Sequence, residues 1–406
     1  MDFMKKTVLL LMFLAVEALH PECDGQEIDG AAIFRQEFRQ IRPVLPRPDT
    51  VSMIFLGDIM LHAEQIRKAS LTQTRPAERD TCGYGRFDFS QYFLSIGSYI
   101  SSADLAVANM EFTLGGPPFT GYPAFSAPDS YAEYMAKCGI DVFLTANNHI
   151  LDRGEQGIRR TLDKYAALEK RFGIKSTGTS MDSLQYHNGN PLVTEMKGIR
   201  VALVNFTYGT NRSVESEYPK VNRSRKSHLQ FLMQKAKESD PDIIIALPHW
   251  GEEYSLKHSG RQYELAQWLA SNGADIIIGT HPHVVQDSIV IRVQDGASSP
   301  KAVPVVFSLG NAISNMSAPN TQIGLMAKVS AVRKMNGKVE ILPIEFTYTW
   351  CSLPGRLRDT HCTIPVKEYL SRSGLWKMPY EYKKMVQTYD RVKETTGIQD
   401  QDNENS

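Results

Sequence analysis

The sequence predicts a mixed α/β fold, and three observations lead to this class. Short runs of Ile, Val, Leu and Ala recur without intervening polar residues, which is typical of strands buried on both faces, as in a parallel sheet. Segments with helical periodicity separate most of these runs. Residue types that bind metals follow the runs at their carboxyl ends. The 406 residues suffice for two or three domains, or for one large α/β domain with insertions.

Composition leaves the ligand open and gives no argument for a nucleic-acid partner. The chain is 42% hydrophobic and 22% charged, which is ordinary for a globular protein. Lys+Arg and Asp+Glu both number 45, so net charge gives no argument for nucleic acid or an anionic membrane surface. We therefore expect no nucleic-acid partner, and substrate selectivity must come from local features.

The N-terminus has the layout of a secretory signal peptide. Two lysines precede the apolar run Val8–Val16, and the small residue Ala18 follows it. The run is shorter than the ~20 residues of a membrane span. We expect cleavage after residue 18, or as late as residue 22, and an exported, periplasmic or cell-envelope protein. Lipidation at Cys23 is the minor alternative, because the residues before it are unlike a lipobox.

One domain accounts for most of the remaining chain. Residues 19–49 form an extended lead-in with several prolines, residues 50–350 the domain, and residues 351–406 a C-terminal extension that packs on it. The tail from Asp390 is charged and is expected to be frayed.

Five cysteines are a modest count, and export would permit disulfides. Cys351 and Cys362 flank a loop rich in Gly, Pro and Arg and are the best candidate pair, although sequence alone does not give connectivity.

The first half of the domain contains three predicted strands that end in potential metal ligands. These strands cover residues 51–56, 103–108 and 140–144. They are followed by Asp58, by Glu111 and by Asn147-Asn148-His149, respectively. Helices are predicted over residues 87–101, 129–139 and 155–172. The Gly/Pro-rich loop 115–128 is long enough to cover a site, with Tyr122, Phe125 and Ser126 as its contact residues.

The second half repeats this arrangement. Buried strands are predicted over residues 242–247, 274–278 and 303–307. They are followed by His249, by His281 and His283, and by Ser308 to Asn311, respectively. A helix ends near Lys237 and another covers residues 261–272. Hairpins are predicted for residues 192–195 with 201–205, and for 325–332 with 339–348, so the sheet is expected to be mixed.

Each polar side chain at a strand end has a structural alternative when taken alone. Asp58 could cap a helix, either asparagine could be a buried hydrogen-bonded amide, and His249 could belong to the core. The coincidence favours a metal site, because four of the 10 histidines fall at these turns. Right-handed crossovers would bring the strand ends to one edge of the sheet.

A mixed set of imidazole, carboxylate and amide ligands suits Mn²⁺, Zn²⁺ or Fe²⁺ and suits Ca²⁺ poorly. The candidates include no cysteine, which argues against a structural zinc site. One ion or two ions could be bound, and a bound water would be the nucleophile. His149 could donate a proton to the leaving group. Asp152 could orient His149 or cap the next helix, and the sequence leaves both open.

Six motifs together resemble one family. In order they are Gly57-Asp58-Ile59-Met60, Asn109-Met110-Glu111, Asn147-Asn148-His149 with Asp152 and Gly154, His249-Trp250-Gly251-Glu252-Glu253-Tyr254, Gly279-Thr280-His281-Pro282-His283 and Ser308-Leu309-Gly310-Asn311. Across residues 51–315 this resembles the CapA family of capsule or poly-γ-glutamate synthesis proteins, a branch of the calcineurin-like metallophosphoesterases. The resemblance implies a four-layer α/β/β/α sandwich with mixed sheets and a metal site at the strand ends.

The resemblance also implies roles for individual residues. The metal ligands it implies are Asp58, Glu111 in the bridging position, Asn148, His249, His281 and His283, with His149 and Asp152 as catalytic residues. Expected substrate contacts are Asn147, Trp250, Glu253, Tyr254, Ser308 and Asn311. Two departures stand out: Ile59-Met60 replaces the usual imidazole two residues after the first Asp, where His62 could compensate, and Glu111 replaces an Asp.

Two functions follow from the resemblance. The first is an exported metal-dependent hydrolase that cleaves a phosphoester or amide bond during synthesis of capsule or poly-γ-glutamate. The alternative is a non-catalytic envelope protein that binds, exports or anchors an anionic polymer. An anionic cell-envelope polymer or its precursor, and other capsule-synthesis proteins, are the expected partners.

Overall fold

The computed structural model describes residues 50–71, 87–294 and 300–400. The expected signal peptide, the lead-in segment and Cys23 therefore lie outside the described residues. Within the described ranges, the strands form sheets of nine, six and two strands. No helix among them is long and apolar enough to cross a membrane.

The nine-stranded sheet is mixed and is built around β1. Its main path runs β17-β16-β14-β1-β2-β3-β4, with β13 paired to β1 and β15 paired to β14. Strands β1, β2, β3 and β4 are parallel, whereas β14, β16 and β17 are antiparallel to their neighbours. The bounds are β1 Thr50–Ile59, β2 Leu105–Met110, β3 Val142–Leu144, β4 Lys175–Thr177, β13 Asn311–Ile313, β14 Ile323–Arg333, β15 Val339–Ile341, β16 Glu345–Ser352 and β17 Cys362–Pro365.

The six-stranded sheet has the order β11-β12-β10-β9-β7-β6. Strands β7, β9, β10 and β12 are parallel, and an antiparallel strand closes each edge. The bounds are β6 Leu192–Met196, β7 Ile199–Thr207, β9 Ile243–His249, β10 Ile276–Ile278, β11 Ser288–Val293 and β12 Lys301–Val306; β5 Thr179–Ser180 and β8 Lys220–Val221 form the small sheet.

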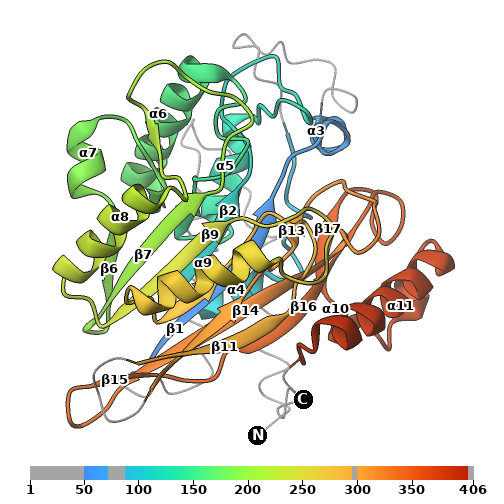
Figure 1. The fold of residues 1–406 in the computed structure, drawn as a ribbon. Coiled ribbons are helices and arrows are strands. Elements are labelled where there is room, and N and C mark those ends of the chain that lie inside the picture. The colour runs from blue at the N-terminus through green and yellow to red at the C-terminus, as the bar shows by residue number, and fades with distance from the viewer. Residues whose placement is uncertain (1–49, 72–86, 295–299, 401–406) are drawn as a thin grey trace, which may run out of the picture.

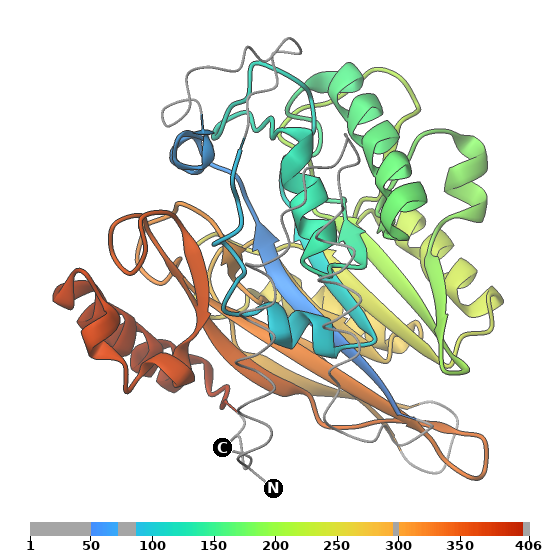
Figure 2. The ribbon, with the colours of Figure 1, turned by 180° about the vertical axis from the view of Figure 1, so that it is seen from behind.

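Five of the helices cover the outer faces of the two large sheets. Buried side chains of α4, α5 and α6 pack on the nine-stranded sheet, and those of α8 and α9 pack on the six-stranded sheet. Figure 1 shows α9 lying across the six-stranded sheet, and Figure 2 shows the opposite side of the molecule. The helices are α3 Ala63–Ala69, α4 Gly97–Ser102, α5 Asp129–Lys137, α6 Gly154–Phe172, α7 Ser183–Asn188, α8 Lys226–Glu238, α9 Gly260–Ser271, α10 Val366–Tyr369 and α11 Pro379–Thr396.

A continuous apolar core joins the inner faces of the two sheets. Alternate side chains such as Met53 and Phe55 of β1 pack in one cluster with Ile245 of β9 and Ile278 of β10. The intervening side chains of β1, such as Ile54, pack against the outer helices. Two sheets face to face with helices outside give four layers, α/β/β/α, so the predicted fold class is confirmed. Burial on both faces explains why the strand sequences are uniformly apolar.

Two predicted elements differ from the structure. The helix expected over residues 87–101 is confined to α4, because the preceding residues form turns. The long strand expected over residues 339–348 is interrupted between β15 and β16. The interruption contains Pro343, which has no backbone N–H to donate to the ladder.

The C-terminal segment is part of the fold. Strand β16 crosses the boundary expected at residue 350 and pairs with β17. Helix α11 packs Met385 and Val392 into the core between the sheets. The chain from Asp390, expected to be frayed, continues α11 to Thr396. Asp400 then accepts hydrogen bonds from the Tyr348 backbone and the Tyr389 hydroxyl.

The predicted disulfide is wrong. Cys351 lies opposite Thr363 in the β16–β17 ladder, and Cys362 lies opposite Ser352. This offset of one residue places the two thiols on opposite faces of the sheet, in different apolar clusters. Both cysteines are unbridged.

Close backbone packing fixes the end of β1, and this generates a prediction. A Cβ added to Gly57 would lie 1.9 Å from the carbonyl oxygen of Gly310, which accepts the hydrogen bond of Asp58 N. We expect Gly57→Ala to lose about 1–3 kcal/mol of unfolding free energy, because the backbone must shift. Chemical denaturation measures this. The control is Gly97→Ala, where a Cβ meets nothing within 4 Å; equal stability of both variants would contradict the close approach.

Candidate metal centre

Two carboxylates from adjacent parallel strands lie at the centre of the site. Asp58 is part of β1 and Glu111 directly follows β2, and both are fully buried. The amide of Asn109 donates to Asp58 Oδ1 at 2.7 Å and lies 3.5 Å from Glu111 Oε2. Asn147 holds that amide in place by donating to Asn109 Oδ1. The nine-stranded sheet therefore presents two acidic groups side by side, away from bulk water.

The six-stranded sheet supplies the histidines. His249 is the last residue of β9, and His281 and His283 lie on the turn that follows β10. The turn is held against the first sheet, because His281 N donates to Asp58 Oδ2 at 3.1 Å. His281 has φ 101° and His283 has φ 58°, in the left-handed region that non-glycine residues rarely adopt. Such conformations cluster at functional sites.

The tautomer of His283 follows from its neighbour Asn311. The Asn311 amide nitrogen donates to the carbonyl oxygens of His283 and Thr321, so its Oδ1 is an acceptor. His283 Nδ1, 3.0 Å from that oxygen, must carry the proton. In the neutral ring, Nε2 then presents a lone pair toward Glu111 Oε1 at 3.7 Å.

Glu111 Oε1 is the focus of three imidazoles. It lies 3.7, 3.8 and 4.0 Å from the Nε2 atoms of His283, His249 and His149, respectively. It is buried and has no hydrogen-bond partner, and His281 Nδ1 is in the same situation. A buried acceptor without a partner is costly. Atoms that share one ion at about 2.0–2.2 Å lie roughly 3–4 Å apart, so this spacing suits ligands of a common cation.

The donor atoms fit a divalent metal. They form two overlapping groups, one of Glu111, His281 and His283 and one of Asp58, Glu111 and His249, with atoms within 4.8 Å of one another. Nitrogen and oxygen donors without sulfur suit Mn²⁺, Zn²⁺ or Fe²⁺. Because Glu111 belongs to both groups, the arrangement is compatible with one ion or with two.

Electrostatics support the same interpretation. Burial would raise the pKa of Asp58, but the hydrogen bond to His283 and the charges of His249 and His283 outweigh it and lower this pKa to about 2. Burial and the charge of Asp58 raise the pKa of Glu111 well above its usual value. Burial, reinforced by the charge of His283, lowers the pKa of His281 to about 3, so this ring is neutral and free to bind a metal.

His149 lies beside this cluster and is held by Asp152. The Nδ1 atom of His149 is 2.7 Å from Asp152 Oδ2, which also accepts the backbone N–H of Phe125. The N-cap of α6 is Arg153. Asp152 therefore orients His149. The Phe125 ring packs edge-on against the imidazole at 4.7 Å.

The remaining predicted residues separate into buried and exposed groups. Asn148 Oδ1 lies 2.8 Å from His249 Nε2, next to the carboxylates. Four expected substrate contacts are buried and hydrogen-bonded within the protein: Asn147, Trp250, Ser308 and Asn311. Glu253 and Tyr254 are exposed. His62 is the N-cap of α3, and its Nδ1 contacts Gln65 and the Asn315 backbone.

Tyr208 and Asn211 also contact the site and were not predicted from the sequence. The Tyr208 ring packs at a tilt against His281 with ring centroids 4.6 Å apart, and Asn211 Nδ2 is 3.3 Å from His149 Nδ1. Both follow β7, which was predicted only as half of a hairpin. It also pairs in parallel with β9, so its carboxyl end reaches the same edge as His249. The other site residues were predicted because they follow the carboxyl ends of parallel strands. The same rule would have indicated Tyr208 and Asn211 if the parallel pairing of β7 with β9 had been recognised.

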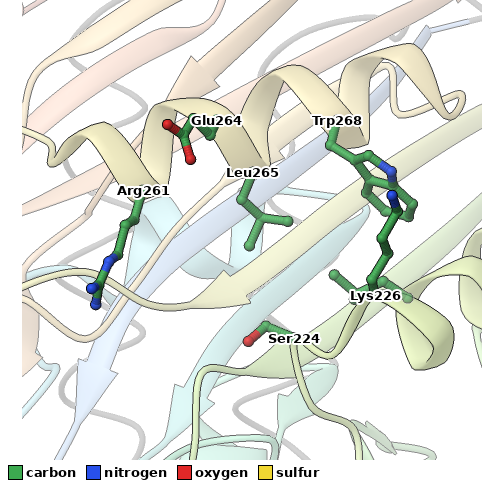
Figure 3. Close-up of a pocket in the computed structure, with 7 residues that line it drawn as sticks. Ser224, Lys226, Arg261, Glu264, Leu265 and Trp268 are labelled. Carbon is green, nitrogen blue, oxygen red and sulfur yellow. The ribbon is translucent and has the colours of Figure 1, made fainter.

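A groove of about 270 Å³ lies elsewhere, between the start of α8 and α9 (Figure 3). Leu265 and Trp268 of α9 line it with Lys226 and Arg261, and none of its lining residues belongs to the metal cluster. The metal chemistry of the described residues lies at the strand ends and not in this groove.

Comparison with known proteins identifies the relatives of the chain. Residues 52–316 match the family model described as "Bacterial capsule synthesis protein PGA_cap". The capsule biosynthesis protein CapA of Bacillus anthracis is 26% identical over 296 residues, 69% of this chain and 64% of that protein. The PGA biosynthesis protein CapA of Bacillus subtilis is 28% identical over 308 residues, 73% and 72% of the two chains. The chain thus spans less than two thirds of the first relative.

Solved structures give weaker likenesses. The NAD nucleotidase of Haemophilus influenzae has a TM-score of 0.42 at 13% identity, over 84% of this chain and 62% of that one. A 5'-nucleotidase precursor of Thermus thermophilus has a TM-score of 0.41 at 12% identity, over 84% and 58%. At these values the likeness says nothing about the substrate.

The geometry predicts stabilisation by a divalent metal. We expect saturating Mn²⁺ or Zn²⁺ to raise the melting temperature, since ligand at 100 times Kd contributes about 2.7 kcal/mol. Differential scanning fluorimetry measures the shift, and a chelator should reverse it. His281→Ala should lose the shift, while His187→Ala, on the exposed face of α7, should keep it. An unchanged shift in His281→Ala would place the metal elsewhere.

Metal binding should also release a proton. The raised pKa of Glu111 favours its protonated form in the metal-free chain, and the ion requires the carboxylate. Affinity should therefore fall as pH is lowered. Titration calorimetry in buffers of different ionisation enthalpy should show release of about one proton per binding event. Heats that are independent of the buffer would contradict this protonation state.

Proposed function

Since the chain belongs to the PGA_cap family of bacterial capsule synthesis proteins, as its motifs predicted, we propose that it is a metal-dependent hydrolase of capsule or poly-γ-glutamate synthesis. Its substrate would contain a phosphoester or an amide bond. The observation that carries the proposal is the buried Glu111 Oε1, which lacks a hydrogen-bond partner and is surrounded by imidazoles. A purely structural carboxylate would have a donor.

Five side chains would hold the metal: Asp58, Glu111, His249, His281 and His283. A divalent ion at such a site supplies Lewis-acid polarisation of the substrate oxygen and an acidified water. Asn109 and Asn311 keep Asp58 and His283 in position through hydrogen bonds. Because these supporting amides are buried, the ligands are preorganised and need little rearrangement on binding.

His149 is placed to move a proton. The N–H at Nδ1 of His149 donates a hydrogen bond to Asp152, and Nε2 is therefore directed toward Glu111 Oε1 and the metal ligands. A proton carried on Nε2 could pass to the leaving group, and the Asp152 carboxylate would stabilise the imidazolium that holds it.

Export is part of the proposal and rests on the sequence. Lys5 and Lys6 followed by Val8–Val16 have the pattern of a secretory signal. An envelope location fits the synthesis of a polymer outside the cell. The alternative function, binding or anchoring an anionic polymer without cleavage, uses the same fold and differs in its need for the proton donor.

Hydrolysis tests the proposal directly. We expect the Mn²⁺-loaded protein to cleave bis(4-nitrophenyl) phosphate or a γ-glutamyl anilide, with His281→Ala reducing kcat/KM by at least about 100-fold. His187→Ala is the control, since its exposed ring takes no part in the cluster. Polymer binding without turnover of either substrate class would support the non-catalytic alternative.

A second variant separates positioning from metal binding. Asp152→Asn should preserve the metal-induced thermal shift, because Asp152 contacts His149 and is absent from the donor groups. It should lower kcat about 10–100-fold through loss of the oriented proton donor. An unaltered kcat would exclude His149, oriented by Asp152, as the acid.

A further inference from the structure

Three exposed tyrosine rings each pack against an imidazole of the site. Ring centroids are 4.6 Å apart for Tyr208 and His281, 6.5 Å for Tyr254 and His283, and 6.4 Å for Tyr122 and His149. The tyrosines are 48%, 48% and 73% exposed, respectively. The histidines beneath them retain only 3–4% exposure. We call Tyr122, Tyr208 and Tyr254 the tyrosine rim.

Two of the three rim residues are hydrogen-bonded to the backbone that carries the metal ligands. Tyr208 N donates to His249 O at 2.9 Å, and Tyr254 N donates to Pro282 O at 2.8 Å. Tyr254 has φ 69°, a conformation that few non-glycine residues adopt. Because the main chain at these two tyrosines is fixed, their exposed rings are preorganised and lose little entropy when they contact a ligand.

This exposure is concentrated at the site. Among the described residues five tyrosines are exposed, and the other two, Tyr263 and Tyr380, lie on α9 and α11. Large aromatic rings exposed without a partner are typical of binding surfaces. The grouping of three around one metal cluster therefore indicates a subsite for part of the substrate.

The charge at this subsite is negative. Glu253 is exposed next to Tyr254. Burial raises the pKa values of Tyr208 and Tyr254, and the charge of Glu253 adds to both shifts. Within the described part of the chain, no Lys or Arg forms an ion pair with Glu253. A divalent ion would neutralise Asp58 and Glu111, and the exposed Glu253 carboxylate would remain as a negative charge beside the rim.

We propose that the tyrosine rim and Glu253 bind an ammonium group of the substrate, next to the bond that the metal site cleaves. The proposal rests on the proposed hydrolase function and narrows its substrate to a phosphoester or amide that carries a nearby amine. Aromatic faces attract cations through the ring quadrupole, and a carboxylate adds charge complementarity. A neutral sugar ring would stack on the tyrosines but gain nothing from Glu253. A second anionic group would be repelled.

The test compares two probes of equal shape and different charge. Choline and its neutral isostere 3,3-dimethylbutan-1-ol are titrated into the Mn²⁺-loaded full chain at constant ionic strength, followed by calorimetry or NMR. Choline is expected to bind about five- to tenfold more tightly than the isostere. Equal affinities, tighter binding of the isostere, or binding of neither probe would overturn the ammonium subsite.

Matched variants assign the effect to residues. Glu253→Gln should reduce the preference for choline over the isostere at least about threefold, and Tyr254→Leu should weaken choline binding at least about threefold. Glu252→Gln, an exposed neighbour, and Tyr380→Leu, on α11, should leave both affinities unchanged. A Glu253→Gln variant that keeps the full preference for choline would exclude this carboxylate as the cation's partner.

The outcomes separate this inference from the hydrolase proposal. Selective choline binding by a protein that never hydrolyses either test substrate would leave the cation subsite standing and remove the proposed function. Hydrolysis that depends on His281, together with no preference for choline, would retain the hydrolase and overturn the inference alone.

Discussion

The structure depends on one electrostatic constraint: two carboxylates, Asp58 and Glu111, are buried next to each other, and no Lys or Arg among the described residues forms an ion pair with either. Like charges in a low-dielectric interior are costly unless a proton or a cation compensates them. The opposed pKa shifts of the pair express this constraint, because the lowered pKa of Asp58 leaves Glu111 to take up the proton. Exchange of that proton for a divalent ion is the physical basis of the proposed chemistry.

The two-sheet architecture makes this arrangement possible. The first sheet delivers acidic groups at the ends of β1 and β2, and the second delivers imidazoles at the ends of β9 and β10. The shared apolar core fixes the sheets against each other, so neither half of the site needs to be assembled by a flexible loop. The contact between His281 N and Asp58 joins the two halves at the site itself.

Much of the fold and of the cluster could be predicted from sequence, because uninterrupted apolar strands followed by metal-binding residue types form a local pattern. The order of layers needed the family resemblance, since periodicity does not show which strands share a sheet. Tyr208 was not predicted as a site residue because β7 has two partners. It pairs antiparallel with β6 and parallel with β9, and only the pairing with β6 has a turn signal in the sequence. The predicted Cys351–Cys362 disulfide is wrong because the two cysteines are offset by one residue between β16 and β17. Such an offset places their side chains on opposite faces of the sheet. The buried indole of Trp250 donates a hydrogen bond to the carbonyl of Phe307, a distant residue that no local sequence pattern reveals as its partner.

Anomalous diffraction from crystals of the Mn²⁺-loaded protein tests the central claim most directly, because it locates the ion without reference to activity. The account predicts a strong anomalous peak within coordination distance of Glu111 Oε1 and of at least two of the surrounding imidazoles. A fully loaded crystal whose anomalous peaks all lie away from Asp58 and Glu111 would contradict it, and the buried carboxylates would then need another explanation.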